Sequence, residues 1–269
     1  MTRVLVILGC FCSILLGGYF AFSKWAIRHE NVALFDVARD RAVSLEITVL
    51  RDSERRAAAG LTKLPVAIIS QGNTVKNTEY SFLADVLAAR GYLVVSIQHD
   101  LPTDTPLVTA PGKLYEGRLP EYQRAEKTIF YVIGELKKIQ PNADYGRLTM
   151  VGHSNGGDIS MFFAQQNPDL VKMVVTLDNL RFPYLTSGTA KILSFRSMDW
   201  KPDRGVVPSE AQSVKSGIEI VQTDARHVDM SDRGPDRVKE KIAGTLDQFL
   251  NDHGSTLPVP DETGQPHHP

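Results

Sequence analysis

Cysteine is almost missing from this sequence of 269 residues, which contains only Cys10 and Cys12. Both stand near the start of the chain, so no disulfide can join distant parts of residues 13–269. The residues around them also lack the cysteine and histidine spacing of a zinc site. The absence of cysteine from residues 13–269 is compatible with an oxidising compartment.

An excess of charge of either sign is also missing. Thirty Lys and Arg face 31 Asp and Glu, which leaves a formal net charge of -1. This balance gives no global attraction to nucleic acid, and we expect no nucleic-acid partner. The apolar fraction of 42% is ordinary for a globular protein, and the length suits one α/β domain without internal repeats.

Charged residues are absent from the stretch between Arg3 and Lys24. As a helix, residues 4–23 would span about 30 Å, the thickness of a bilayer core. Residues 1–23 are therefore predicted to be a signal peptide or an N-terminal membrane anchor. Ala21 and Ser23 are small residues at positions -3 and -1 of a cleavage site, and both alternatives stay open. Either one predicts an exported (periplasmic or extracellular) protein, or one anchored through residues 4–23 with its domain outside the cytoplasm.

The rest of the chain alternates between short apolar runs and helical patterns. Residues 32–50 alternate apolar and polar side chains, which predicts a hairpin, and residues 51–64 are expected to be a surface connection. Strands are predicted over 65–69, 92–97, 147–151, 171–177, 191–195 and 218–221, and helices over 78–90, 120–140, 155–166, 209–215 and 233–250.

This order predicts an α/β fold: a doubly wound, mostly parallel sheet, placed over residues 32–252. The one long interval, residues 99–119, is rich in Pro, Thr and Gly and is expected to be a loop, so no large cap domain is predicted. Residues 254–269 hold four prolines without apolar periodicity and are expected to be a disordered tail.

The motif Gly152-His153-Ser154-Asn155-Gly156 follows one predicted strand and precedes a predicted helix. A serine held on a sharp strand-to-helix turn between two glycines is typical of a nucleophile elbow. The sequence therefore predicts Ser154 as a nucleophile, with His153 as a packing residue of the turn.

A serine hydroxyl needs a base and an acid that orients the base. His227 lies between the last predicted strand and the last predicted helix, which makes it the candidate base, with His99 as its rival. Asp178 and Asp199 both follow predicted strands and lie before His227 in the chain. The residues themselves leave the choice between these two acids open.

Four segments resemble the platelet-activating-factor acetylhydrolase and dienelactone-hydrolase-like branch of the α/β-hydrolases. These are Phe35-Asp-Val-Ala-Arg-Asp-Arg41, Ser70-Gln-Gly-Asn73, Gly152-His-Ser-Asn-Gly-Gly157 and Leu177-Asp-Asn-Leu-Arg-Phe-Pro183. The resemblance covers about residues 32–250 and implies the α/β-hydrolase fold. In the acetylhydrolases the acid stands in the Leu-Asp…Phe-Pro segment, which favours Asp178, whereas the usual superfamily position favours Asp199.

The oxyanion hole is expected to use two backbone N–H groups. One belongs to Asn155, the residue after the nucleophile, and the other to Asn73, in the loop after the strand 65–69. The family that the sequence resembles usually has His-Gly in this loop, whereas this chain has Gln71-Gly72. Gly72 is kept, so the backbone donor is expected to remain.

Together these residues predict a serine hydrolase that cleaves an ester or related acyl bond through an acyl-enzyme. The expected substrate is a small-molecule or lipid-like ester, and no cofactor or metal is implied. Two other classes stay open: a non-catalytic hydrolase-like domain, and a membrane-tethered protein that binds lipid without cleaving it.

Overall fold

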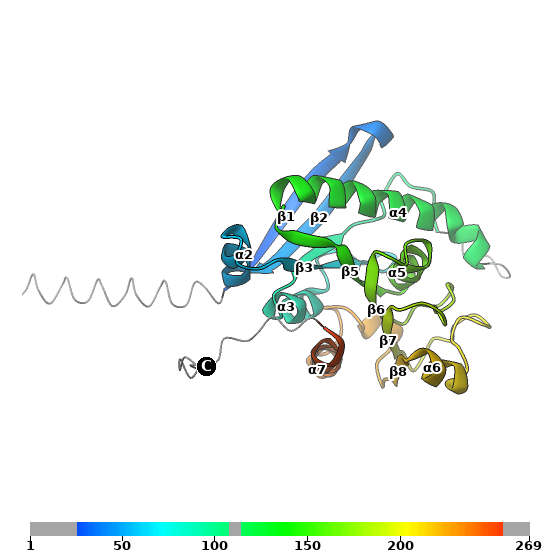
Figure 1. Ribbon diagram of the computed structural model, residues 1–269. Coiled ribbons are helices and arrows are strands. Elements are labelled where there is room, and N and C mark those ends of the chain that lie inside the picture. The colour runs from blue at the N-terminus through cyan, green and yellow to red at the C-terminus, as the bar shows by residue number, and fades with distance from the viewer. Residues whose placement is uncertain (1–25, 108–113, 255–269) are drawn as a thin grey trace, which may run out of the picture.

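An eight-stranded sheet forms the centre of the molecule in the computed structural model, which describes residues 26–107 and 114–254 (Figure 1). The strand order is β1-β2-β4-β3-β5-β6-β7-β8. The strands are β1 (Ile27–Asp36), β2 (Arg41–Leu50), β3 (Leu64–Ser70), β4 (Leu93–Ile97), β5 (Ala143–His153), β6 (Val171–Leu177), β7 (Lys191–Arg196) and β8 (Ile218–Gln222). Strands β3 to β8 pair in parallel, while β1 with β2 and β2 with β4 are antiparallel. The predicted mostly parallel α/β sheet is thus confirmed.

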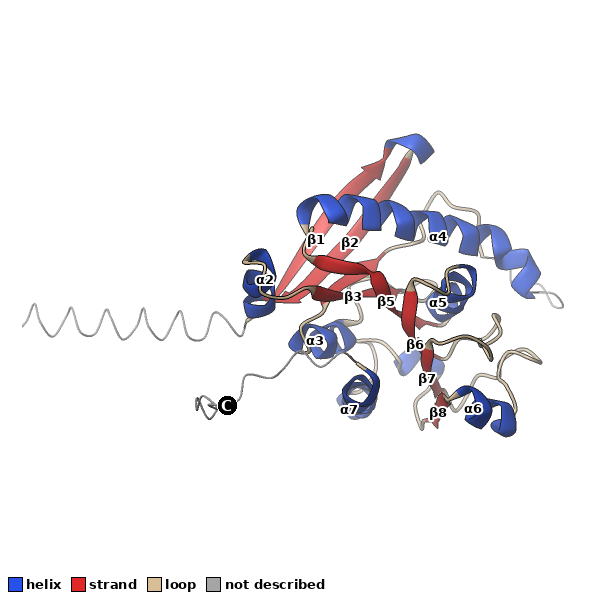
Figure 2. Ribbon diagram, in the orientation of Figure 1, coloured by secondary structure: helices blue, strands red, loops and turns tan. Residues whose placement is uncertain are grey.

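Helices cover both faces of this sheet (Figure 2). They are α2 (Arg51–Ala58), α3 (Ser81–Ala89), α4 (Leu114–Ile139), α5 (Asn155–Gln166), α6 (Glu210–Ser216) and α7 (Asp236–His253), with single 3-10 turns at Val37–Arg39 and His227–Asp229. Because side chains alternate along a strand, β3 divides its residues between two cores. Ile68 packs in the core that includes residues of α4 and α5, and Ile69 in the core that includes residues of α3 and α7.

The hairpin over residues 32–50 is also confirmed, although β1 begins earlier, at Ile27. Its tip is a 3-10 turn in which the Asp36 carboxylate accepts hydrogen bonds from the backbone N–H groups of Ala38 and Arg39. Asp40 then takes a left-handed conformation with φ 49°. Asp tolerates this conformation better than most residues, and it reverses the chain into β2.

Several predicted boundaries are wrong: β5 begins at Ala143 rather than at residue 147, α7 begins at Asp236 rather than at residue 233, and three helices differ as follows. The connection 51–64 contains helix α2, whose Arg, Glu and Ala residues favour helix, and Ala57 buries its side chain. Helix α3 begins at Ser81, with Tyr80 at its N-cap, rather than at residue 78. Helix α4 begins at Leu114, so Pro120 lies inside it rather than at its start.

The extra turns of α4 have a packing explanation. The ring of Tyr115 meets the ring of Phe182 edge-on, with centroids 4.7 Å apart, and stacks with Tyr122 at 6.5 Å. These aromatic contacts favour helix before Pro120, where a missing N–H removes one helical hydrogen bond. The loop after β4 is therefore shorter than predicted.

The predicted N-terminal segment 1–23 and almost all of the predicted tail 254–269 lie outside the described residues. Within residues 26–107 and 114–254, no helix combines the length and the apolarity that a membrane crossing requires.

Candidate active site

Ser154 occupies the sharp turn between β5 and α5. Its backbone has φ 53° and ψ -121°, a conformation that residues other than glycine adopt only when the surrounding structure enforces it. A Cβ on Gly152 would lie 2.1 Å from the carbonyl oxygen of Gly156, and one on Gly156 would lie 2.0 Å from that of Ser70. The two glycines of the motif are therefore steric requirements of the turn.

The structure brings three of the predicted site residues into one hydrogen-bonded line. The Oγ of Ser154 lies 2.9 Å from Nε2 of His227, and Nδ1 of His227 lies 2.6 Å from Oδ2 of Asp178. Ser154 is partly accessible, whereas His227 and Asp178 are buried. The nucleophile candidate is thus the member of the line that solvent reaches, and its two partners are shielded from solvent.

Asp178 is held as a carboxylate by several donors. Its Oδ1 lies 2.8 Å from Nη2 of Arg196 and accepts the backbone N–H of Ser197 at 3.1 Å. Burial alone would raise the pKa of Asp178, but the hydrogen bond from His227 and the charge of Arg196 together keep that pKa below its ordinary value. The ionised carboxylate fixes which nitrogen of His227 carries the proton: Nδ1 donates to Asp178, and Nε2 is left to accept.

Asp199, the other predicted acid, lies in the loop that follows β7. Its Oδ1 accepts a hydrogen bond from the backbone N–H of His227 at 2.7 Å, while its side chain is exposed. It therefore contacts the backbone that carries the imidazole rather than the imidazole itself.

His99, the rival base, is separate from this line. Its Nε2 lies 3.0 Å from the Oγ of Ser70, and its backbone N–H donates to Oε1 of Gln71. Burial lowers the pKa of His99 to about 3, with the charges of Arg41 and Arg124 adding to the effect. His99 is thus a neutral, buried residue that braces the loop after β3.

The two predicted oxyanion residues lie on different segments, one at the start of a helix and one in a loop. Asn155 is the first residue of α5, where a helix leaves its N–H groups without an intrahelical acceptor. Asn73 is exposed and follows Gly72 in a turn closed by the N–H of Val75 and the C=O of Gly72. Gln71 is buried and donates to the carboxylate of Asp100.

The side chain of Asn155 donates to Oε1 of Glu121 on α4, a residue that no sequence motif marks. Glu121 and Asn73 line a small polar pocket of about 110 Å³ together with Asp100, Leu101, Asp104, Thr105, Pro106, Leu107 and Arg124. Burial, with a smaller effect from the charge of Asp100, raises the pKa of Glu121 to about 7. Of the two predicted oxyanion residues, Asn73 lines this pocket and Asn155 is hydrogen-bonded to Glu121 in its wall.

Two segments that meet at His227 carry three exposed apolar side chains, Met198 and Trp200 on one and Val228 on the other, which together are called the apolar lip. The indole of Trp200 stacks on the imidazole of His227 with centroids 4.4 Å apart and an interplanar angle of 14°. Trp200 is 47% exposed, Met198 66% and Val228 54%, so all three apolar side chains also face solvent. The backbone N–H of Met198 donates to the C=O of Ala225, which holds the two segments of this lip together.

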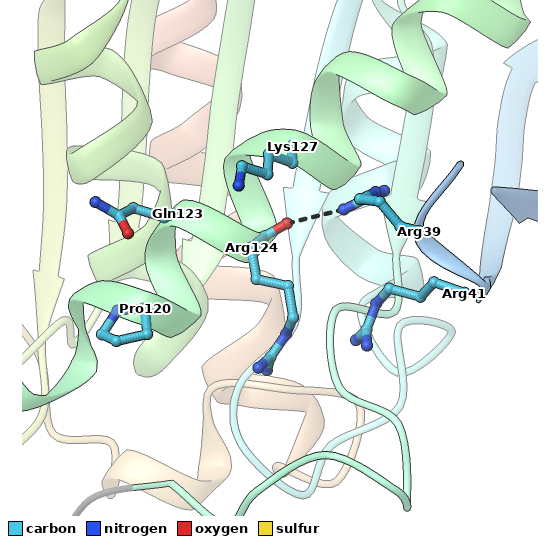
Figure 3. A pocket seen from close by; sticks show the side chains of 6 residues that line it. All are labelled: Arg39, Arg41, Pro120, Gln123, Arg124 and Lys127. Atoms are coloured by element: carbon cyan, nitrogen blue, oxygen red, sulfur yellow. Dashed lines mark hydrogen bonds between the residues drawn. The ribbon is translucent and has the colours of Figure 1, made fainter. Parts of the chain in front are cut away.

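A separate pocket of about 290 Å³ lies between the hairpin tip and α4, lined by Arg39, Arg41, Pro120, Gln123, Arg124 and Lys127 (Figure 3). All three of its arginines have partners, and Arg124 lies 3.4 Å from the carboxylate of Asp104 and 3.7 Å from that of Asp100. Arg39 pairs with Asp36 and donates to the C=O of Arg124, and Arg41 makes two hydrogen bonds to Asp104. These contacts clamp the hairpin to α4 and to the loop after β4.

Known proteins share this architecture. A profile of the family described as alpha/beta hydrolase fold matches residues 117–201, a segment that contains Ser154 and Asp178. No curated protein matches the sequence. The structure resembles a ferulic acid esterase from Streptomyces cinnamoneus at 14% identity, with a TM-score of 0.59 over 91% of this chain and 94% of that chain.

Two further solved structures are similar. A fungal esterase from Rhizomucor miehei has 14% identity and a TM-score of 0.58, over 85% of this chain and 84% of that one. A dienelactone hydrolase-like promiscuous phosphotriesterase, P91, from metagenomic libraries has 12% identity and a TM-score of 0.57, over 85% of this chain and 99% of that one. This chain therefore has the α/β-hydrolase fold.

Proposed function

We propose that the protein is a serine hydrolase that cleaves carboxylic esters through an acyl-enzyme on Ser154. The observation that carries this proposal is the line from Ser154 through His227 to Asp178, with distances of 2.9 and 2.6 Å. Esterases occur among the similar solved structures, which supports the same class of reaction.

In the proposed reaction, Nε2 of His227 takes the proton from the Ser154 hydroxyl while its oxygen attacks the ester carbonyl. Asp178 stabilises the imidazolium that forms. The N–H groups of Asn155 and Asn73 hold the oxyanion of the tetrahedral intermediate. His227 then gives its proton to the leaving alcohol, and water repeats the sequence to release the acid.

The apolar lip suggests which part of the substrate lies where. His227 protonates the leaving alcohol, so the alcohol group lies on the side of this imidazole. Trp200 stacks on this imidazole and is half exposed, and Met198 and Val228 on the same two segments are exposed as well. We therefore propose an ester with an apolar or aromatic alcohol group, which would cover this surface on binding.

Turnover of short p-nitrophenyl esters tests the reaction. The wild type should release p-nitrophenol, whereas Ser154→Ala should fold with a similar melting temperature and lose more than about a thousandfold in kcat. Retention of most of the activity by Ser154→Ala would refute the assignment of the nucleophile.

Acetate esters of different alcohols test the lip. Trp200→Ala should lower kcat/KM for naphthyl acetate about tenfold and leave methyl acetate nearly unchanged, since the loss is one of apolar contact. Trp200→Phe is the matched control and should retain most of the preference. An equal loss on both esters would place the alcohol group elsewhere.

A further inference from the structure

The imidazole of His153, the residue before Ser154, contacts two loops at once. Its Nε2 lies 2.9 Å from the backbone C=O of His227, and its Nδ1 lies 3.0 Å from the hydroxyl of Tyr80. That hydroxyl in turn accepts the backbone N–H of Gly72 at 2.9 Å. A continuous series of hydrogen bonds therefore runs from the loop after β3 to the loop that carries His227.

Every proton in this series has one possible place. The carbonyl of His227 can only accept, so Nε2 of His153 carries a proton. Burial lowers the pKa of His153 to about 3, and the nearby His227 adds to the effect, so the ring is neutral and its Nδ1 is an acceptor. The Tyr80 hydroxyl donates to Nδ1, and its oxygen is left to accept the N–H of Gly72.

The surroundings leave these groups little freedom. Tyr80 is 1% and His153 3% exposed, so water does not compete for their hydrogen bonds. A Cβ on Gly72 would lie 2.8 Å from Nδ1 of His153 and 3.3 Å from the Tyr80 hydroxyl, which shows how closely the loop packs on this pair. The C=O of Tyr80 accepts the N–H groups of Leu83 and Ala84, which anchors Tyr80 to α3.

We propose that His153 and Tyr80 are positioning residues for the hydrolysis proposed above, on which this inference rests. Through the C=O of His227 they set the place of the imidazole between Asp178 and Ser154. Through the N–H of Gly72 they set the turn whose next residue, Asn73, is the proposed oxyanion donor. Their hydrogen bonds reach the backbone of His227 and Gly72, and the His153 ring also packs on the His227 imidazole with centroids 4.9 Å apart. They thereby couple the base to the oxyanion loop.

Three variants test this coupling: Tyr80→Phe, His153→Gln and the double variant. The control is Tyr145→Phe, because Tyr145 is buried on the same strand as His153 and its hydroxyl donates to the C=O of Gln140. Steady-state kcat and KM for p-nitrophenyl acetate are measured per active site, counted by titration with a fluorophosphonate, so that partial unfolding does not lower the apparent rate.

We expect each single variant to lower kcat about tenfold or more, with KM changed by less than about twofold, because a displaced imidazole affects the transition state rather than binding. The double variant should be about as slow as the slower single one, since both changes break the same series. Tyr145→Phe should keep the wild-type kcat.

A wild-type kcat per titrated site in Tyr80→Phe and His153→Gln, even with a lower melting temperature, would overturn the proposal, because their role would then be structural only. Additive losses in the double variant would overturn the coupling. Failure of the proposed function is distinguishable, because it would appear in the wild type as absent labelling and absent turnover.

A second measurement does not depend on turnover. At about pH 6, well above the lowered pKa of His153, ¹⁵N NMR should find the His153 ring protonated at Nε2 alone. A ring protonated at Nδ1 would contradict the assignment.

Discussion

Asp199 accepts a hydrogen bond from the backbone N–H of His227, 2.7 Å away. The imidazole of that histidine instead meets the carboxylate of Asp178, on the neighbouring strand end, at 2.6 Å. The two acids that follow adjacent strands thus have different relations to the same histidine, one to its backbone and one to its ring.

This difference predicts unequal effects of the two amide variants. Asp178→Asn should lower kcat at least about a hundredfold, because the amide no longer favours the tautomer with Nε2 free to accept; the equivalent change in a serine protease costs about ten-thousandfold. Asp199→Asn should lose less than about tenfold, since an amide oxygen still accepts the N–H of His227. Both variants are measured on one activated ester, with thermal melts as the folding control. The reverse order of losses would make Asp199 the acid.

The elbow glycines predict a folding defect. Gly156→Ala would place a Cβ 2.0 Å from the C=O of Ser70, between two pieces of backbone that cannot move apart without breaking the sheet. We expect little soluble protein and no cooperative melt. The matched control is Gly134→Ala in α4, where a Cβ meets nothing within 4 Å and where alanine should raise the free energy of unfolding by about 0.5–1 kcal/mol. Wild-type stability in Gly156→Ala would show that the turn tolerates a side chain.

Buried His99 predicts a dependence of stability on pH. Its pKa is about 3 in the folded protein and 6.5 is the ordinary value, so between these values the unfolded chain binds a proton that the folded chain does not. The stability that His99 contributes is therefore lost as pH falls from 6.5 towards 3. Burial raises the pKa of Asp158 to about 6, which acts in the opposite direction, so the informative quantity is the difference between variant and wild type.

His99→Gln should lower the slope of unfolding free energy against pH by up to about 1.4 kcal/mol per unit, the value for one proton. Urea titrations at several pH values between about 4 and 6 give this slope. Equal slopes in variant and wild type would mean that His99 is protonated in the folded protein.

Much of the candidate site can be predicted from local patterns in the sequence. The glycines that flank Ser154 lie within two residues of it, so the elbow and its strained serine can be predicted from a five-residue motif. The order of strands and helices places Asp178 and His227 at the same end of the sheet as Ser154, which explains why chain order could point to His227 as the candidate base. Between Asp178 and Asp199 the residues alone left the choice open and the resemblance favoured Asp178. In the fold it is Asp178 whose carboxylate meets the imidazole of His227, while Asp199 meets its backbone.

Other features depend on packing that no local pattern records. Trp200 contacts His227 from another loop, and Tyr80 reaches His153 across 73 positions of the sequence. Helix α4 extends before Pro120 because Tyr115 packs on Phe182, a contact between distant segments. Tertiary packing there outweighs the preference of proline for the first turn of a helix.

Labelling with a fluorophosphonate tests the central claim most directly, because the reagent forms a covalent bond only with an activated serine hydroxyl. The wild type should gain one label per chain, and peptide mass spectrometry should locate it on Ser154. Asp178→Asn should label much more slowly and Ser154→Ala not at all. A folded wild-type protein that takes up no label, or takes it up on another residue, would contradict the assignment of Ser154, His227 and Asp178 as a hydrolytic site.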